Sequence, residues 1–323
     1  MKRTSLLLSL IASFCISSGY TAHATISVGT IERDTILGVP CRIYLPYKYA
    51  ERVNSSKTVF PVLYLQHGMY GSEDDWTVQG DLLRLMNMLL LAGQVKEMVI
   101  IMPDNFLGSI PPEERYQLME APNVTPAGEK FDTSKGSAHW RKLTGDQEKS
   151  YEMSGYWEEH FREFMDAAES RYSIATDPAR KAIAGLSMGG FHTMHVSHYL
   201  RDQFAYIGLF SAVIIPQQGN EEVSPEYDSQ YHTTGFDYQI EYQSPAYSNW
   251  MEEMRHMASA PPMYWIGMGC DDFLYAQMQD YRLWLDTNHF EYTYYESTGG
   301  HTWQNWQNYL CRFLKKIFWD DNF

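Results

Sequence analysis

Cysteine is scarce in this 323-residue chain, and its few copies are far apart. Of the four, Cys15 lies in the N-terminal segment, which leaves Cys41, Cys270 and Cys311. Three separated cysteines make no disulfide framework and match no zinc-binding spacing. The sequence therefore predicts no metal site built on cysteine, and it leaves open whether one pair among the three forms a disulfide.

Basic residues are outnumbered by acidic ones. Lys and Arg total 25 against 40 Asp and Glu, which gives a formal charge of −15 at pH 7. A surface of this sign repels phosphate backbones, and no basic cluster offsets it. We therefore expect no nucleic acid partner. Internal repeats and low-complexity segments are absent as well, which argues against a repeat protein.

Long apolar runs are confined to the N-terminus. Two basic residues at positions 2 and 3 precede an apolar run over 6–16, and small residues follow at Ala22–Ala24. This order is typical of a secretory signal peptide, and the run is too short to span a bilayer. We expect residues 1–24 to be a signal peptide and residues 25–323 a single exported domain, periplasmic or extracellular, with no membrane span.

The rest of the chain alternates between apolar runs and amphipathic stretches. Near-continuous apolar runs indicate strands buried on both faces, as in a parallel sheet with helices on both sides. The first two runs, with a tight turn marked by Gly38, predict an antiparallel edge hairpin, and polar residues 48–57 predict a loop. Strands are expected over 35–40, 41–46, 59–66, 98–104, 181–184, 204–210, 263–268 and 290–296, and helices over 81–91, 157–172, 189–199, 275–288 and 303–318.

Two long segments, 105–150 and 214–250, show little periodicity. Long segments without regular structure inside a compact fold are often functional. We expect both to be surface insertions over the carboxyl edge of the sheet, where they would shape a substrate cleft.

Ser187 occupies the centre of a Gly-x-Ser-x-Gly pentapeptide. The apolar run before it predicts a strand and the residues after it a helix, so the serine lies on a sharp strand-to-helix turn. Side chains at Gly185 and Gly189 would clash with neighbouring backbone in such a turn. The pattern predicts a nucleophilic serine, although a glycine-rich turn with an incidental serine would show the same sequence pattern.

An acid and a base follow Ser187 in the order used by α/β-hydrolases. Asp271 and Asp272 end one expected strand, and His301 follows the last one, so all lie at the carboxyl edge of the sheet. His301 would accept the serine proton and a carboxylate would orient the imidazole. Asp272 is preferred because it lies past the tight turn, and an N-cap or solvated turn is the alternative for either aspartate.

Backbone N–H groups are expected to bind the oxyanion. Met188 follows the nucleophile, and Met69 (or Gly68) lies in the glycine-rich turn after the strand over 59–66. His67 is expected to brace that turn rather than to act as a base. No metal is expected on the elbow helix, because one helix cannot present its three histidines to one ion, and no cofactor is expected at all. Those histidines are His192, His195 and His198.

These motifs together resemble the putative-esterase family of α/β-hydrolases. The resemblance covers roughly residues 30–318 apart from the two insertions. It implies Ser187 as nucleophile, Asp272 as acid and His301 as base, and the C-terminal motif most resembles the feruloyl and acetyl xylan esterases. The matching stretches are Leu65-Gln66-His67-Gly68, Gly185-Leu186-Ser187-Met188-Gly189-Gly190, Gly269-Cys270-Asp271-Asp272-Phe273-Leu274 and Gly299-Gly300-His301-Thr302-Trp303-Gln304-Asn305-Trp306.

The resemblance implies an exported serine carboxylesterase that removes feruloyl or acetyl groups from plant cell-wall polysaccharide, or that acts on small aryl or alkyl esters. S-formylglutathione hydrolases share the family, but the expected signal peptide argues against a cytosolic substrate. The alternatives are an acyltransferase of the mycolyltransferase type, a catalytically silent glycan-binding module, and a serine peptidase on the same scaffold.

Overall fold

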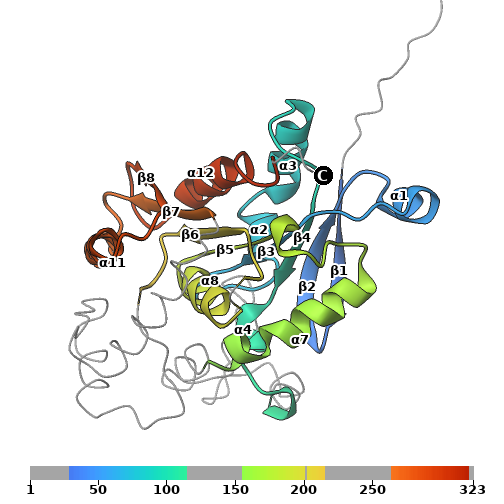
Figure 1. The fold of residues 1–323 in the computed structure, drawn as a ribbon, viewed down its shortest axis with the longest axis horizontal. Coiled ribbons are helices and arrows are strands. Elements are labelled where there is room, and N and C mark those ends of the chain that lie inside the picture. The colour runs from blue at the N-terminus through green and yellow to red at the C-terminus, as the bar shows by residue number, and fades with distance from the viewer. Residues whose placement is uncertain (1–28, 115–154, 201, 215–262, 320–323) are drawn as a thin grey trace, which may run out of the picture.

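The computed structural model describes residues 29–114, 155–200, 202–214 and 263–319. Their centre is one eight-stranded sheet with the order β1-β2-β4-β3-β5-β6-β7-β8, which Figure 1 shows crossing the molecule. The strands are β1 Thr30–Ile36, β2 Val39–Leu45, β3 Val62–Gln66, β4 Val99–Pro103, β5 Lys181–Leu186, β6 Tyr206–Phe210, β7 Met263–Gly269 and β8 Thr293–Ser297.

Helices connect these strands. The described helices are α1 Tyr49–Ser56, α2 Asp75–Val78, α3 Leu82–Leu91, α4 Asn105–Gly108, α7 Tyr156–Arg171, α8 Met188–Tyr199, α11 Tyr275–Thr287 and α12 Trp303–Leu314, with a short 3-10 turn at Pro178–Arg180. Within the described part of the chain, no helix combines the length and the apolar character needed to cross a membrane.

Six neighbouring strands form a continuous parallel block. β2 pairs antiparallel with both β1 and β4, and every pair from β4 through β3, β5, β6 and β7 to β8 is parallel. The chain passes from β3 to β4 on one side and returns to β5 on the other, so the winding reverses at β3. Open α/β sheets bind ligands at the carboxyl ends of strands beside such a reversal. This is the α/β-hydrolase arrangement expected from the sequence.

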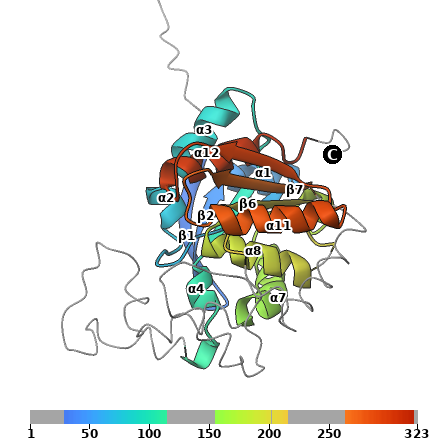
Figure 2. The same ribbon diagram turned by 90° about the vertical axis from the view of Figure 1, so that its left-hand side faces the viewer.

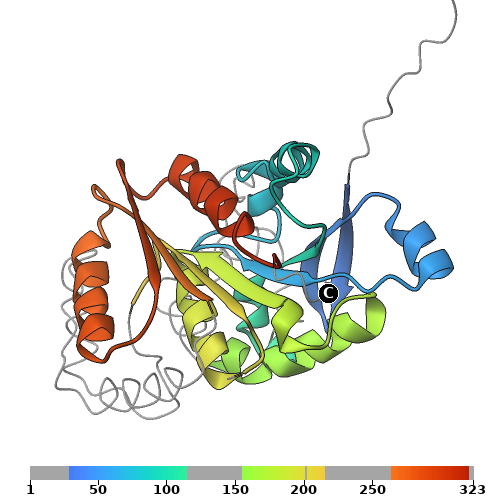
Figure 3. The same ribbon diagram turned by 45° about the horizontal axis from the view of Figure 1, so that its top comes forward.

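Both faces of the sheet are covered, and alternate residues of a strand enter different layers. Val62 and Tyr64 of β3 pack with the helices α7, α8 and α11. Leu63 and Leu65 pack with α3 and α12. Figure 2 shows α3 and α12 on one side of the sheet and α7, α8 and α11 on the other, and Figure 3 shows the sheet between them. Burial on both sides explains the uninterrupted apolar runs of the central strands.

The edge hairpin is confirmed, but its first strand was placed wrongly. β1 begins at Thr30 and ends before a turn at Leu37 and Gly38, both with positive φ. Residues 48–57, expected to be a loop, instead contain helix α1. Tyr49 and Val53, one turn apart, pack against the core. Only two apolar positions of this helix make tertiary contacts that stabilise it. Two such positions are too few to give a helical periodicity in the sequence.

The predicted start of the first insertion, residue 105, was also wrong. Residues 105–110 are buried rather than exposed: Phe106, Leu107 and Ile110 form a small apolar cluster against Met69. Asp104 begins α4 by accepting the Leu107 N–H at 2.8 Å. Of the expected insertions, 115–150 and 215–250 lie outside the described residues, as does the expected signal peptide.

Candidate active site

Ser187 lies at a strained turn between β5 and α8. Its φ of 52° and ψ of −117° are rarely adopted by a residue with a side chain. The surrounding backbone fixes this conformation. The Ser187 N–H donates to the Phe210 carbonyl at 2.9 Å, and its own carbonyl accepts from Gly190 at 3.0 Å and Val213 at 3.2 Å. Neighbouring strands and the first turn of α8 therefore hold the strain.

The two bracketing glycines are required by close backbone approach. A Cβ on Gly185 would lie 2.2 Å from the Gly189 carbonyl oxygen. A Cβ on Gly189 would lie 2.2 Å from the His67 carbonyl oxygen, so the start of α8 packs directly on the end of β3. Contacts this short with backbone cannot be relieved by side-chain rotation. The elbow predicted from the pentapeptide is present for the steric reason expected.

The structure brings Ser187, His301 and Asp272 together. His301 Nε2 lies 2.9 Å from Ser187 Oγ, and His301 Nδ1 lies 2.9 and 3.1 Å from the two carboxylate oxygens of Asp272. The Asp272 side chain is fully buried and the His301 side chain is 16% exposed. One ring therefore joins the hydroxyl to the carboxylate, and part of that ring is open to solvent.

The two neighbouring aspartates have different partners. Asp272 Oδ1 also accepts the Leu274 N–H at 3.0 Å, which leaves its carboxylate fixed under the imidazole. Asp271 is exposed and exchanges two hydrogen bonds with the backbone of Gly299, each of 3.1 Å. Asp272 thus faces His301, and Asp271 ties the β7 loop to the loop that carries His301.

Two aromatic residues hold the His301 ring. Phe273 lies tilted against it at a centroid distance of 4.5 Å, and Trp306 meets it edge-on at 4.9 Å. Asn305 fixes the preceding loop by donating to the Gly300 carbonyl at 2.9 Å. Sequence reasoning assigned no role to Phe273 or Trp306. Only their positions in the sequence could have indicated a role: Phe273 directly follows Asp272, and Trp306 lies in the first helical turn after His301.

The expected oxyanion loop lies against the elbow. Residues 68–71 form a tight turn closed by the Gly71 N–H donating to the Gly68 carbonyl at 3.1 Å, with Tyr70 at φ 64°. A Cβ on Gly68 would lie 3.3 Å from the Ser187 Cβ and 2.5 Å from Leu186. Met188 is the first residue of α8, where N–H groups have no acceptor within the helix.

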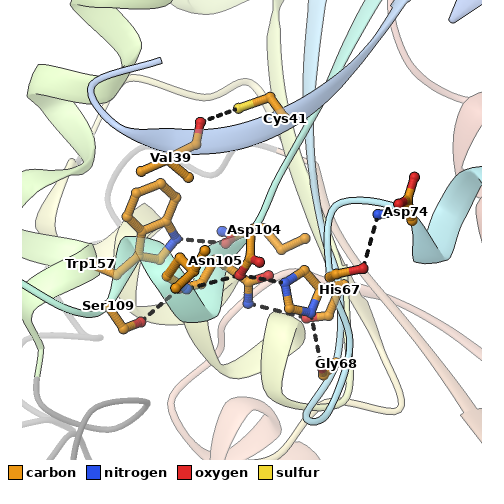
Figure 4. Close-up of polar contacts among 12 residues, drawn as sticks. Val39, Cys41, His67, Gly68, Asp74, Asp104, Asn105, Ser109 and Trp157 are labelled. Atoms are coloured by element: carbon orange, nitrogen blue, oxygen red, sulfur yellow. Dashed lines mark hydrogen bonds and ion pairs between the residues drawn. The ribbon is translucent and has the colours of Figure 1, made fainter. Parts of the chain in front are cut away.

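A buried polar cluster lies next to this loop (Figure 4). Gln66, His67, Asp104 and Asn105 are at most 1% exposed. The Gln66 side chain accepts from Trp157 at 2.8 Å, and Asn105 donates to the His67 carbonyl at 3.2 Å. His67 Nδ1 lies 2.8 Å from the Gly68 carbonyl oxygen. His67 therefore braces the turn, as the sequence suggested, and its polar neighbours beyond that turn, Asp104 and Asn105, come from one distant segment.

The elbow-helix histidines are not gathered around an ion. Among the described residues, no group of three His, Cys, Asp or Glu side chains could hold a metal. His192 instead lies 2.6 Å from Glu158, where both side chains are buried, and His195 packs on Phe191. The three cysteines at 41, 270 and 311 are free thiols.

Comparison with known proteins agrees with this geometry. A family model described as "Putative esterase" matches residues 38–317. The chain belongs to this esterase family. A curated relative, an endo-1,4-beta-xylanase/feruloyl esterase from Xylanibacter ruminicola, is 28% identical over 169 residues. That match covers 52% of this chain and 19% of the relative, so the chain spans only a small part of the relative's length.

Solved structures of this fold include further esterases. A ferulic acid esterase from Anaeromyces mucronatus has a TM-score of 0.62 at 21% identity, with 92% of this chain and 94% of that chain covered. A feruloyl esterase module from Clostridium thermocellum has a TM-score of 0.56 at 15% identity, covering 91% and 89%. An S-formylglutathione hydrolase from Staphylococcus aureus has a TM-score of 0.53 at 16% identity, covering 89% and 96%. At these identities the likeness establishes the α/β-hydrolase fold.

Gly189→Ala is expected to destabilise the protein by about 3 kcal/mol, because its Cβ would press on a backbone oxygen that cannot move aside. Urea unfolding of both forms measures this difference. Gly93→Asn is the control, since a Cβ there meets nothing within 4 Å at φ 63°, and asparagine tolerates left-handed backbone at a cost of about 1 kcal/mol or less. Equal losses for the two variants would contradict the close approach of α8 to β3.

Proposed function

We propose that this protein is an exported serine carboxylesterase that hydrolyses feruloyl or acetyl esters of plant cell-wall polysaccharide. The observation that carries the proposal is the bridging position of His301, whose nitrogens lie 2.9 Å from Ser187 Oγ and 2.9 Å from an oxygen of Asp272. A serine hydroxyl is a weak nucleophile without an adjacent base, and this geometry supplies one.

In the proposed reaction, Ser187 Oγ attacks the ester carbonyl carbon while His301 Nε2 accepts the hydroxyl proton. The carbonyl electron pair moves to oxygen, and collapse of this tetrahedral species expels the alcohol, which takes the proton from Nε2. Water then repeats the sequence on the acyl-enzyme. Asp272 keeps the Nδ1 proton directed at itself and stabilises the imidazolium that forms in each half-reaction.

The oxyanion is proposed to bind between two backbone N–H groups, those of Met188 and Met69. Met188 adds the unpaired N–H and the positive end of the α8 dipole. Met69 follows Gly68, where an added Cβ would lie only 3.3 Å from the Ser187 Cβ. Both donors are fixed before substrate arrives, so they cost little reorganisation when charge develops.

The choice of substrate is supported by the relatives. The curated relative and two of the solved structures are named as feruloyl or ferulic acid esterases. Phe273, 49% exposed and packed on His301, offers an aromatic face at the open side of the site. Aromatic faces suit both phenolic acyl groups and sugar rings. Export is inferred from the signal-like composition of residues 1–24.

Ser187→Ala is expected to abolish hydrolysis of methyl ferulate and of 4-nitrophenyl acetate, because it removes the hydroxyl that lies 2.9 Å from His301 Nε2. Turnover should fall by about 10⁴-fold or more, with an unchanged circular dichroism melt as the control. Release from methyl ferulate, acetylated xylan and 4-nitrophenyl butyrate by the unaltered protein ranks the acyl groups. Near-normal turnover by the variant would refute the nucleophile, and acyl transfer to an added alcohol that outpaces hydrolysis would make the protein a transferase.

Asp272→Asn and Asp271→Asn form a matched pair that tests the acid. Asp272→Asn should lower kcat by about 10³–10⁴-fold, because an amide can favour the wrong imidazole tautomer. Asp271→Asn should stay within about threefold, because its amide oxygen still accepts the Gly299 N–H. Steady-state kinetics on 4-nitrophenyl acetate measures both. The reverse ranking would move the acid by one residue.

A further inference from the structure

The Gly68–Met69 peptide is held by its carbonyl group. The Gly68 oxygen accepts the Gly71 N–H at 3.1 Å and lies 2.8 Å from His67 Nδ1. A trans peptide is planar, so its C=O and N–H point in opposite directions. Whatever fixes the Gly68 carbonyl therefore also fixes the direction of the Met69 N–H.

The contacts of the His67 ring indicate where its protons are. A carbonyl oxygen can only accept, so Nδ1 must carry a proton to bond with Gly68. The other nitrogen, Nε2, has no hydrogen bond within the described residues and faces Asp104 Oδ1 at 3.6 Å. A bare Nε2 would turn its lone pair toward a carboxylate. A ring with both nitrogens protonated satisfies both neighbours.

Asp104 is fixed where it faces the ring. Its Oδ1 accepts the Leu107 N–H at 2.8 Å, which begins helix α4, and the residue is 1% exposed. Burial alone lowers the pKa of His67, but the neighbouring Asp104 carboxylate, with smaller contributions from Asp75 and the Gly68 carbonyl, raises it to about 9. The other charged groups around this cluster are Glu73 and the ion pair of Arg42 with Asp74.

We propose that His67 and Asp104 are positioning residues, a buried imidazolium–carboxylate pair that holds the Gly68–Met69 peptide with its N–H directed at the oxyanion. This inference rests on the proposed function, in which the Met69 N–H is an oxyanion donor. The positive charge on His67 has two effects. It strengthens the hydrogen bond from Nδ1 to the Gly68 carbonyl. It also disfavours a flipped peptide, in which the Met69 N–H would point at the Nδ1 proton.

Loss of the His67 proton should release the loop. A neutral ring that keeps its proton on Nδ1 turns a lone pair toward Asp104, and one that keeps it on Nε2 turns a lone pair toward the Gly68 oxygen. The pair is therefore complete below a pH of about 9 and is lost as the pH rises through that value. Turnover should fall on the alkaline side for this reason.

Two isosteric variants separate hydrogen bonding from packing. Asn at position 67 places an amide N–H where Nδ1 stands, and Leu places a methyl group there. His67→Leu should lower kcat on 4-nitrophenyl acetate by up to about a hundredfold with KM within about threefold, because a mispositioned oxyanion donor affects the transition state alone. His67→Asn should recover at least a tenth of the lost rate. Equal kcat for the two folded variants would overturn the proposal.

Asp104→Asn separates the charge from the cap. The amide oxygen at the Oδ1 position can still accept the Leu107 N–H. The amide carries no charge, so burial favours a neutral His67 ring, which keeps its proton on Nδ1 toward the Gly68 carbonyl. The alkaline fall in kcat near pH 9, measured against the spontaneous hydrolysis blank, should therefore disappear in this variant. An alkaline limb that is unchanged from the unaltered protein would contradict a role for the His67 charge.

An NMR experiment reports on the Gly68–Met69 peptide without measuring turnover. The sequence contains two Gly–Met pairs, Gly68–Met69 and Gly267–Met268, so protein labelled with carbonyl-¹³C glycine and ¹⁵N methionine gives two coupled carbonyl signals. The Gly68 carbonyl should shift as the pH passes 9 and in His67→Leu. Gly267, whose carbonyl accepts from Ser211 in the sheet, is the reference.

The kinetic and NMR experiments together distinguish failure of the proposed function from failure of the positioning pair. Unaltered protein without Ser187-dependent hydrolysis would refute the proposed function, and the carbonyl signal would still report whether His67 holds the peptide. A Gly68 signal that ignores both pH and His67→Leu would overturn the positioning pair even in an active esterase.

Discussion

The close approach of helix α8 to the end of β3 is the constraint on which this site depends. Gly189 lies so near the His67 carbonyl that no side chain fits between them, and this contact places the Ser187 turn beside the Gly68 loop. Ser187 retains a left-handed backbone because the Phe210 carbonyl and the Val213 N–H both bond to it. The nucleophile and the proposed oxyanion loop are thus one packed unit.

The parallel sheet brings the other half of the site to the same edge. β7 and β8 pair in register from Trp265 with Thr293 to Gly269 with Ser297, so the loops that follow them begin side by side. Asp271 ties those loops together through two hydrogen bonds with the Gly299 backbone, and Asn305 fixes the second loop through the Gly300 carbonyl. The carboxylate at 272 and the ring at 301 are thus held by several hydrogen bonds and ring contacts rather than by one strong interaction.

Charge is distributed unevenly around the site. The described part of the chain buries two histidine–carboxylate pairs besides the one at Ser187: His67 with Asp104, and His192 with Glu158. Such pairs lose hydration on burial, and their mutual attraction offsets that cost only when both partners are fixed. Both lie where β3, α4, α7 and α8 meet, under the loops proposed to bind the oxyanion. Their rigidity is therefore tied to that of the elbow.

The alternation of strands and helices was readable from the sequence because burial on both sheet faces leaves near-continuous apolar runs. Helix α1 was missed since only Tyr49 and Val53 contact the core. The prolines and charges that follow residues 105–110 predict a surface loop, yet Phe106 and Leu107 are fully buried. In both cases a long-range contact decided the local structure, and a window of neighbouring residues contains no record of such a contact.

The sequence by itself determined the order and chemistry of the site: a serine between two glycines, an aspartate pair after one strand, and a histidine after the last. These are short-range patterns, because steric limits at a turn act on adjacent residues. The sequence favoured Asp272 over Asp271, and the tertiary structure shows Asp272 facing His301. That Asp104 faces His67 was decided by tertiary structure alone. Those choices depend on which way side chains point after strands far apart in the chain have paired, and only packing fixes that direction.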